Sequence, residues 1–150
     1  IFFFYGILNI VGDNMKIGIV SDHRGYELKK KIIKELKNID FVDYGTNSTD
    51  SVDYPDYAFK LGKAINEREV EFGIAICGSG IGISIACNKV KGIRCARVTT
   101  IKDVIITRID NNSNVIAFSS EINFKKVKRM IEEFINTSFS NNERHQKRIK

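Results

Sequence analysis

Short, nearly all apolar segments alternate with amphipathic segments along most of this chain, and this alternation restricts the fold more than any other feature. Strands with almost no polar positions are typical of a parallel sheet that is covered on both faces. We therefore predict an α/β fold, a three-layer αβα sandwich around a doubly wound, Rossmann-like, five-stranded parallel sheet. The predicted strands are 16–20, 41–44, 72–76, 93–96 and 115–118.

The segments between these strands carry apolar residues at the spacing of amphipathic helices. Leu28, Ile32 and Leu36 mark the first helix, and Pro55 stands where the first turn of a second helix tolerates a proline. The segment 101–109 is ambiguous by periodicity, but the alternation of elements favours a helix there. A final amphipathic helix is predicted from Val127, Met130, Ile131, Phe134 and Ile135.

A length of 150 residues with 43% hydrophobic residues suits one domain with a core of its own. Met15 immediately precedes the first predicted strand, so we expect the domain to cover 15–150 and an N-terminal extension, 1–14, to lie outside its core. The apolar segment 1–11 is too short to span a bilayer and lacks the basic stretch of a signal peptide. We therefore expect no membrane partner.

The three cysteines, Cys77, Cys87 and Cys95, contain no C-x-x-C pair. They are typical of reduced thiols in a cytoplasmic protein, and no metal site is expected. The net charge of +6 would suit nucleic-acid binding, but the excess gathers in two lysine-rich helices and the basic tail 144–150. Because the chain has no recognisable aromatic stacking platform or reader motif, we expect a small anionic substrate and no nucleic acid.

The run Ile76-Cys77-Gly78-Ser79-Gly80-Ile81-Gly82-Ile83-Ser84 places a thiol where an apolar strand gives way to a glycine-rich helix start. Glycines let an anion approach backbone N–H groups closely, and the field of a helix N-terminus favours thiolate over thiol. The G-x-G-x-G spacing after the third strand is a poor match to a nicotinamide-binding turn, and no Gly-Lys-Ser/Thr closes a P-loop. Taken alone, the run favours a tight turn in which Cys77 is a small buried hydrophobe.

Polar residues in other loops favour a functional site. Ligands of doubly wound sheets bind beyond the carboxyl ends of the strands, where we expect the loops at Asp22-His23, Cys77 and Asp110-Asn111-Asn112 to form one pocket. An Asp-His pair suits proton transfer or hydroxyl recognition, with an ordinary surface position as the alternative. Arg144 and Arg148 lie four residues apart, so on a helix they would share a face and grip one phosphate; a solvated basic tail is the alternative.

The order of these motifs is more specific than any one of them. In chain order they are Asp22-His23, Asp53-Tyr54-Pro55, the run 76–84, Asn88-Lys89, Gly92-Ile93-Arg94, Asn111-Asn112-Ser113-Asn114-Val115 and Arg144-His145-Gln146-Lys147-Arg148. Over 15–150 the chain resembles the ribose-5-phosphate isomerase B family, whose relatives isomerise allose 6-phosphate and galactose 6-phosphate. The resemblance implies interconversion of ribose 5-phosphate and ribulose 5-phosphate, a step of the non-oxidative pentose phosphate pathway, through a cis-enediolate and without metal or organic cofactor.

The resemblance also implies a role for each matching residue. Cys77 matches the catalytic base, Ser79 helps to stabilise the enediolate, and Asp110 stands at the position of the ring-opening group. Because family sites combine loops from two subunits, a homodimer is implied, with a homotetramer as a further possibility. The remaining matches bind substrate: Asp22 and His23 at the sugar hydroxyls, Tyr54 and Ile81 along the pocket, Gly78, Gly80 and Gly82 through their N–H groups, Asn111 at the enediolate, and Arg144 and Arg148 at the phosphate.

Several positions depart from the family pattern. Asp110 replaces the histidine that usually opens the sugar ring, which predicts slower turnover of a cyclic sugar than of its open-chain form. Glu121 stands where ribose-specific members often have an arginine, so allose 6-phosphate and galactose 6-phosphate are alternative substrates. A sugar-phosphate-binding homologue with weakened catalysis is the other alternative. Ile83 excludes the branch of the family with a glutamate base at that position, which favours Cys77 as the base.

Overall fold

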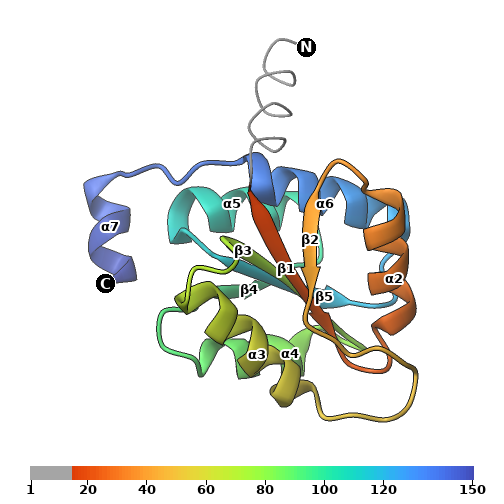
Figure 1. Cartoon of the computed structure of the whole chain (residues 1–150). Coiled ribbons are helices and arrows are strands. Elements are labelled where there is room, and N and C mark those ends of the chain that lie inside the picture. The colour runs from red at the N-terminus through yellow and green to blue at the C-terminus, as the bar shows by residue number, and fades with distance from the viewer. Residues whose placement is uncertain (1–14) are drawn as a thin grey trace.

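The computed structural model describes residues 15–150, so the predicted extension at 1–14 lies outside the described part of the chain. The strands are β1 (Lys16–Ser21), β2 (Asp40–Asp43), β3 (Phe72–Cys77), β4 (Cys95–Arg97) and β5 (Val115–Ser119). They form one sheet in the order β2-β1-β3-β5-β4, and every neighbouring pair is parallel (Figure 1). The predicted five-stranded parallel sheet is confirmed.

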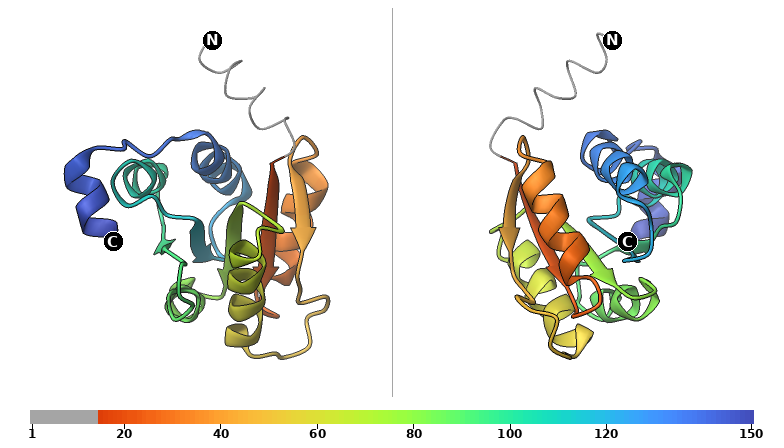
Figure 2. Two further views of the ribbon diagram at one scale, coloured as in Figure 1. Left: turned by 60° about the vertical axis from the view of Figure 1, so that its left-hand side comes forward. Right: turned by 90° about the vertical axis from the view of Figure 1, so that its right-hand side faces the viewer.

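Helices cover both faces of this sheet. Within residues 15–150 they are α2 (Tyr26–Glu35), α3 (Tyr54–Asn66), α4 (Ile81–Asn88), α5 (Ile101–Asn111), α6 (Phe124–Asn136) and α7 (Glu143–Ile149). The first, fourth and fifth of them (α2, α5 and α6) pack on one face, and α3 and α4 pack on the other (Figure 2). The predicted αβα sandwich is therefore confirmed, with α7 outside these layers and against α5.

Successive residues of a strand enter different sides of the core because their side chains point to opposite faces of the sheet. Ile74 and Ile76 of β3 pack with α2, α5 and α6, whereas Ala75 and Cys77 pack with α3 and α4. All four side chains are buried. Burial on both sides explains why the three central strands, β1, β3 and β5, have polar residues only at their ends.

β1, β2, β3 and β5 match the predicted strands to within one residue at each end, but β4 and the helix after it differ from their predicted ranges by two residues. β4 begins only at Cys95, because Ile93 belongs to a turn in which its N–H donates to the carbonyl of Val90. The helix predicted over 101–109 is confirmed as α5, but it continues for two more residues. The residue that follows it, Asn112, adopts the left-handed conformation (φ 48°) that often terminates helices.

The chain changes direction within the sheet at β1. It runs outward from β1 to β2 and then returns past β1 to β3, so β1 and β3 flank the switch point at which doubly wound proteins bind ligands. Asp22 directly follows β1, and Cys77 is the last residue of β3. The fold therefore places the Asp-His turn and the thiol of Cys77 on either side of this crevice.

Candidate active site

The thiol of Cys77 lies where β3 turns into α4 through Gly78, Ser79 and Gly80; residues 77–80 form the thiol loop. Cys77 is 4% exposed, and the N–H of Gly80 donates a hydrogen bond to its Sγ at 3.2 Å. Gly80 has a φ of 75°, and a Cβ at this position would lie 2.6 Å from the backbone of Phe118 on β5. Glycine therefore allows α4 to begin close to β5, with its N-terminal N–H directed at the sulfur.

Three successive carbonyl groups of the thiol loop accept hydrogen bonds from residues at or just after the ends of β5 and β4. The carbonyl of Cys77 accepts from the N–H of Ser120 at 2.9 Å, and that of Gly78 accepts from the hydroxyl of Ser119 at 2.6 Å. The carbonyl of Ser79 accepts from the guanidinium of Arg97. Among residues 15–150, the N–H groups of Gly78 and Ser79 donate no hydrogen bond, so these groups are available to an oxyanion.

The turn after β1 is closed by hydrogen bonds to the side chain of Asp22, and His23 links it to the loop before α3. Asp22 is 5% exposed, and its Oδ1 accepts hydrogen bonds from the N–H groups of Arg24 and Gly25 at 2.9 and 3.0 Å. Nδ1 of His23 accepts from the N–H of Val52 at 3.2 Å, which ties the loop before α3 to the turn after β1. With Nδ1 as an acceptor, a neutral His23 carries its proton on Nε2 and presents a donor there.

Tyr54, the first residue of α3, packs against the start of α4. A Cβ added at Gly82 would lie 2.6 Å from Cζ of Tyr54, so glycine at this position leaves room for the tyrosine ring. Ile81 is half exposed beside it. These contacts bring together most of the predicted site residues in one group, which we call the thiol half: Asp22, His23, Tyr54, Cys77, Gly78, Ser79, Gly80, Ile81 and Gly82.

The other predicted site residues gather around the end of α5. Asp110 and Asn111 are the last two residues of this helix. The buried side chain of Arg108 fixes the turn that follows, with hydrogen bonds to Oδ1 of Asn112 at 3.0 Å and to the carbonyl of Ser113 at 2.6 Å. Burial lowers the pKa of Arg108, and the nearby charge of Arg94 adds to this shift.

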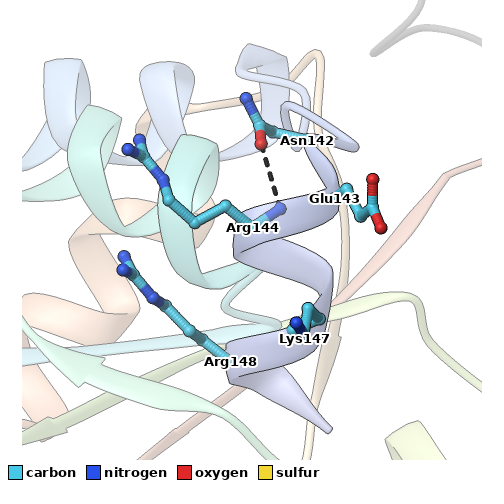
Figure 3. Close-up of a pocket in the computed structure, with 5 residues that line it drawn as sticks. All are labelled: Asn142, Glu143, Arg144, Lys147 and Arg148. Carbon is cyan, nitrogen blue, oxygen red and sulfur yellow. Dashed lines mark hydrogen bonds between the residues drawn. The ribbon is translucent and has the colours of Figure 1, made fainter.

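The arginines predicted to grip a phosphate lie on α7. This helix begins after Asn142, whose Oδ1 accepts from the N–H of Arg144 at 3.0 Å, and Arg144 and Arg148 extend from the same face (Figure 3). The shared face is confirmed. Arg148 also lines a depression together with Asn111, and the imidazole Nε2 of the buried His145 lies 3.7 Å from a carboxylate oxygen of Asp110. We call Asp110, Asn111, Arg144 and Arg148 the arginine half.

The two halves do not meet within one chain, so the prediction of a single pocket from all three loops is wrong. Cys77 lies at the carboxyl end of its strand, opposite Ser119 at the end of β5. Asn111 precedes Val115, the first residue of β5, and therefore lies at the amino ends of the strands. Cys77 and Asn111 therefore lie near opposite ends of β5, a strand about 15 Å long at the usual rise per residue. The physical reason is that the loop before a parallel strand and the loop after it lie at opposite edges of the sheet.

The structure adds three residues to which the sequence pattern assigned no role in this site. Arg97 donates to the thiol loop, and the guanidinium of Arg24 lies so close to Gly78 that a Cβ there would be 2.3 Å from its Nη1. The third is His145, beside Asp110. No periodicity or motif marks these contacts, because each joins segments that are far apart along the chain.

The other two thiols lie away from the crevice. Cys87 is buried on α4 and Cys95 is half-buried at the start of β4. A hydrogen bond with Cys87, together with burial, holds the pKa of Cys95 well above its ordinary value, so Cys95 is poorly suited to act as a thiolate. Cys77 is therefore the cysteine best placed for chemistry.

Residues 15–150 contain no group of three or more histidine, cysteine or acidic side chains arranged to hold a metal ion. None of the helices in this range has the length and apolar character needed to cross a membrane.

Known proteins match this chain over nearly its whole length. A family model described as Ribose/Galactose Isomerase matches residues 17–150. A putative sugar phosphate isomerase of Bacillus subtilis is 41% identical over 139 residues, which are 90% of this chain and 93% of that protein.

Solved structures agree with the sequence match. Ribose-5-phosphate isomerase B of Clostridium thermocellum has a TM-score of 0.86 at 39% identity, over 90% of this chain and 93% of that one. The Mycoplasma genitalium enzyme of the same name, solved with bound ribulose-5-phosphate, has a TM-score of 0.84 at 37% identity, over 91% and 92%. From its fold, its ordered motifs and these matches, the chain belongs to the Ribose/Galactose Isomerase family.

Proposed function

We propose that this chain is an aldose–ketose isomerase that interconverts ribose 5-phosphate and ribulose 5-phosphate, with Cys77 as the base. The thiol loop carries the proposal, because a nearly buried sulfur and the free N–H groups of Gly78 and Ser79 lie on one turn. Family membership, and the ribulose-5-phosphate bound to the Mycoplasma genitalium protein, support a sugar phosphate as the substrate. Reduced thiols in the cytoplasm are part of the same proposal.

The proposed reaction moves one proton between adjacent carbons. The thiolate of Cys77 takes the proton from C2 of the open-chain aldose, the C1–C2 double bond forms, and the carbonyl electron pair moves onto O1. The N–H groups of Gly78 and Ser79 stabilise this enediolate, a role in which the loss of one donor typically costs about 100- to 1000-fold. A proton passes from O2 to O1, the C2 carbonyl forms, and C1 takes the proton back from Cys77, which regenerates the thiolate.

The proposed enzyme is a homodimer in which the thiol half of one copy meets the arginine half of the other. A two-fold axis that brings the thiol half of the first copy to the arginine half of the second also brings the thiol half of the second to the arginine half of the first. One interface therefore completes two sites. Apolar side chains are exposed on three helices: Phe59 on α3 (44%), Ile85 on α4 (57%) and Ile106 on α5 (45%). Such surfaces support a contact between copies, and a second contact of the same kind would give a tetramer.

One assay tests the reaction and the choice of sugar together. We expect ketose formation from ribose 5-phosphate, with slower or no turnover of allose 6-phosphate and galactose 6-phosphate at equal concentrations. Turnover of a hexose phosphate in preference to the pentose would transfer the assignment to that substrate. Binding of all three sugars without any ketose product would show a sugar-phosphate-binding homologue and contradict the proposed activity.

Asp110 provides a test of the ring-opening step. We expect Asp110→His to raise the rate with ribose 5-phosphate about tenfold, because imidazole exchanges protons near neutral pH more readily than a carboxyl group does. Erythrose 4-phosphate cannot form a furanose, since its O4 is esterified, so its rate should change less than about twofold. The measurement is steady-state kinetics with both sugars for the wild type, Asp110→His and the matched control Asp110→Asn. Equal rates of wild type and Asp110→His on ribose 5-phosphate would contradict this account of Asp110.

A further inference from the structure

We infer that Arg97 is a positioning residue of the thiol loop: its guanidinium fixes the Ser79–Gly80 peptide so that the N–H of Gly80 points at the sulfur of Cys77. Arg97 is the last residue of β4, the edge strand, and its side chain is exposed. Its Nε and Nη2 both donate to the carbonyl oxygen of Ser79, at 3.2 and 3.1 Å. The inference rests on the role proposed above for Cys77.

The geometry of one peptide plane links Arg97 to the thiol. The carbonyl and the N–H of a planar trans peptide point in opposite directions, so a rotation of the plane moves both groups together. Arg97 holds the carbonyl end, and the N–H end donates to Sγ at 3.2 Å. The two hydrogen bonds from the guanidinium therefore keep the opposite N–H on the sulfur, and its charge polarises the peptide and strengthens that donor.

The placement of Arg97 is not explained by the stability of the fold. Among residues 15–150, its guanidinium forms no salt bridge. It also lies beside the N-terminus of α4, where a positive side chain is repelled by the partial charge of the helix end. The favourable interaction of Arg97 at this position is its pair of hydrogen bonds to the carbonyl of Ser79.

The contact between Arg97 and the carbonyl of Ser79 can also be removed without changing the sheet. The other carbonyls of the thiol loop are held by Ser119 and Ser120, which lie at the end of β5 itself. Arg97 reaches Ser79 from outside that strand with an exposed side chain. A substitution that shortens or neutralises this side chain therefore changes the thiol loop and leaves the core packing intact.

The test compares Arg97→Met, which keeps the length of the side chain but has no donor, with Arg97→Lys, which keeps the charge and one donor group. The exposed Lys102→Met on α5 is the matched control. Two quantities are measured for each variant: kcat and KM with ribose 5-phosphate, and the rate at which iodoacetamide alkylates Cys77 at fixed neutral pH. Peptide mass spectrometry separates Cys77 from the other thiols, and thermal unfolding checks the fold.

We expect Arg97→Met to lower kcat about tenfold and to slow alkylation of Cys77 about fivefold, with KM changed less than about twofold. Arg97→Lys should recover most of both rates, and Lys102→Met should match the wild type. A raised KM with unchanged kcat, or alkylation of Cys77 at the wild-type rate, would overturn the inference. If Arg97→Met slowed the alkylation of Cys77 but Cys77→Ser kept full activity, the positioning role of Arg97 would be supported and Cys77 would be rejected as the base.

Discussion

Cys77→Ser should lower kcat for ribose 5-phosphate about 1000-fold while KM changes only a few-fold. A serine hydroxyl at this position is a far weaker acid than a thiol, so the variant loses the general base, whose contribution is typically 100- to 10,000-fold. The predicted phosphate contacts at Arg144 and Arg148 are unchanged, and these contacts should dominate substrate binding. The measurement is steady-state formation of ribulose 5-phosphate over a range of substrate concentrations, with thermal unfolding as a check of the fold.

Cys95→Ser is the matched control for this experiment. It removes a thiol whose pKa is raised by its hydrogen bond with Cys87 and by burial, and that thiol has no part in the proposed reaction. We expect its kcat to remain within about twofold of the wild type. If Cys77→Ser kept activity near that of Cys95→Ser, then Cys77 would not be the base, whatever the sugar.

Mixing two inactive variants should restore activity if active sites form between copies. Arg148→Ala removes a charge-assisted contact with the phosphate and should lower kcat/KM about 100-fold, while Cys77→Ser lowers kcat as above. In a hybrid dimer, one site carries both substitutions and the other site carries neither. Random pairing of equal amounts makes half of the dimers hybrids, so the mixture should reach about a quarter of the wild-type activity.

The control mixture pairs Cys77→Ser with a chain that carries both Cys77→Ser and Arg148→Ala. None of its hybrids contains an intact site, so it should stay at the level of the separate variants. Subunit exchange is followed by native mass spectrometry with one variant isotopically labelled. Complete exchange without recovered activity in the first mixture would place each active site within a single chain and refute the shared site.

The element types follow from local patterns, and the structure bears them out. Strands such as 72–76 are apolar on both faces because both faces are covered, and the alternation of such strands with amphipathic segments predicts a parallel sheet. Boundaries are weaker, because the late start of β4 depends on a turn at Ile93 that propensity does not mark.

The site was predicted less completely than the fold, and the reason is the direction of the strands. The thiol half gathers as expected, because Asp22 and Cys77 both follow strands that flank the switch point. Asn111 was placed with them although it precedes its strand, and a loop before a parallel strand lies at the other edge of the sheet. The hydrogen bonds between Arg97 and Ser79 could not be predicted either, since they depend on how β4 is placed in the sheet.

The two halves lie at opposite edges of the sheet, so in the proposed homodimer the number of working sites depends on how many copies of the chain are paired. If neither copy can complete a site alone, working sites exist only in proportion to paired chains. Above the dissociation constant of the pair, the rate rises in proportion to the amount of chain. Far below that constant, the rate falls with the square of the concentration, so a twofold dilution removes about three quarters of the flux. In the proposed homodimer, the flux through the proposed reaction is therefore sensitive to how strongly the chain is expressed.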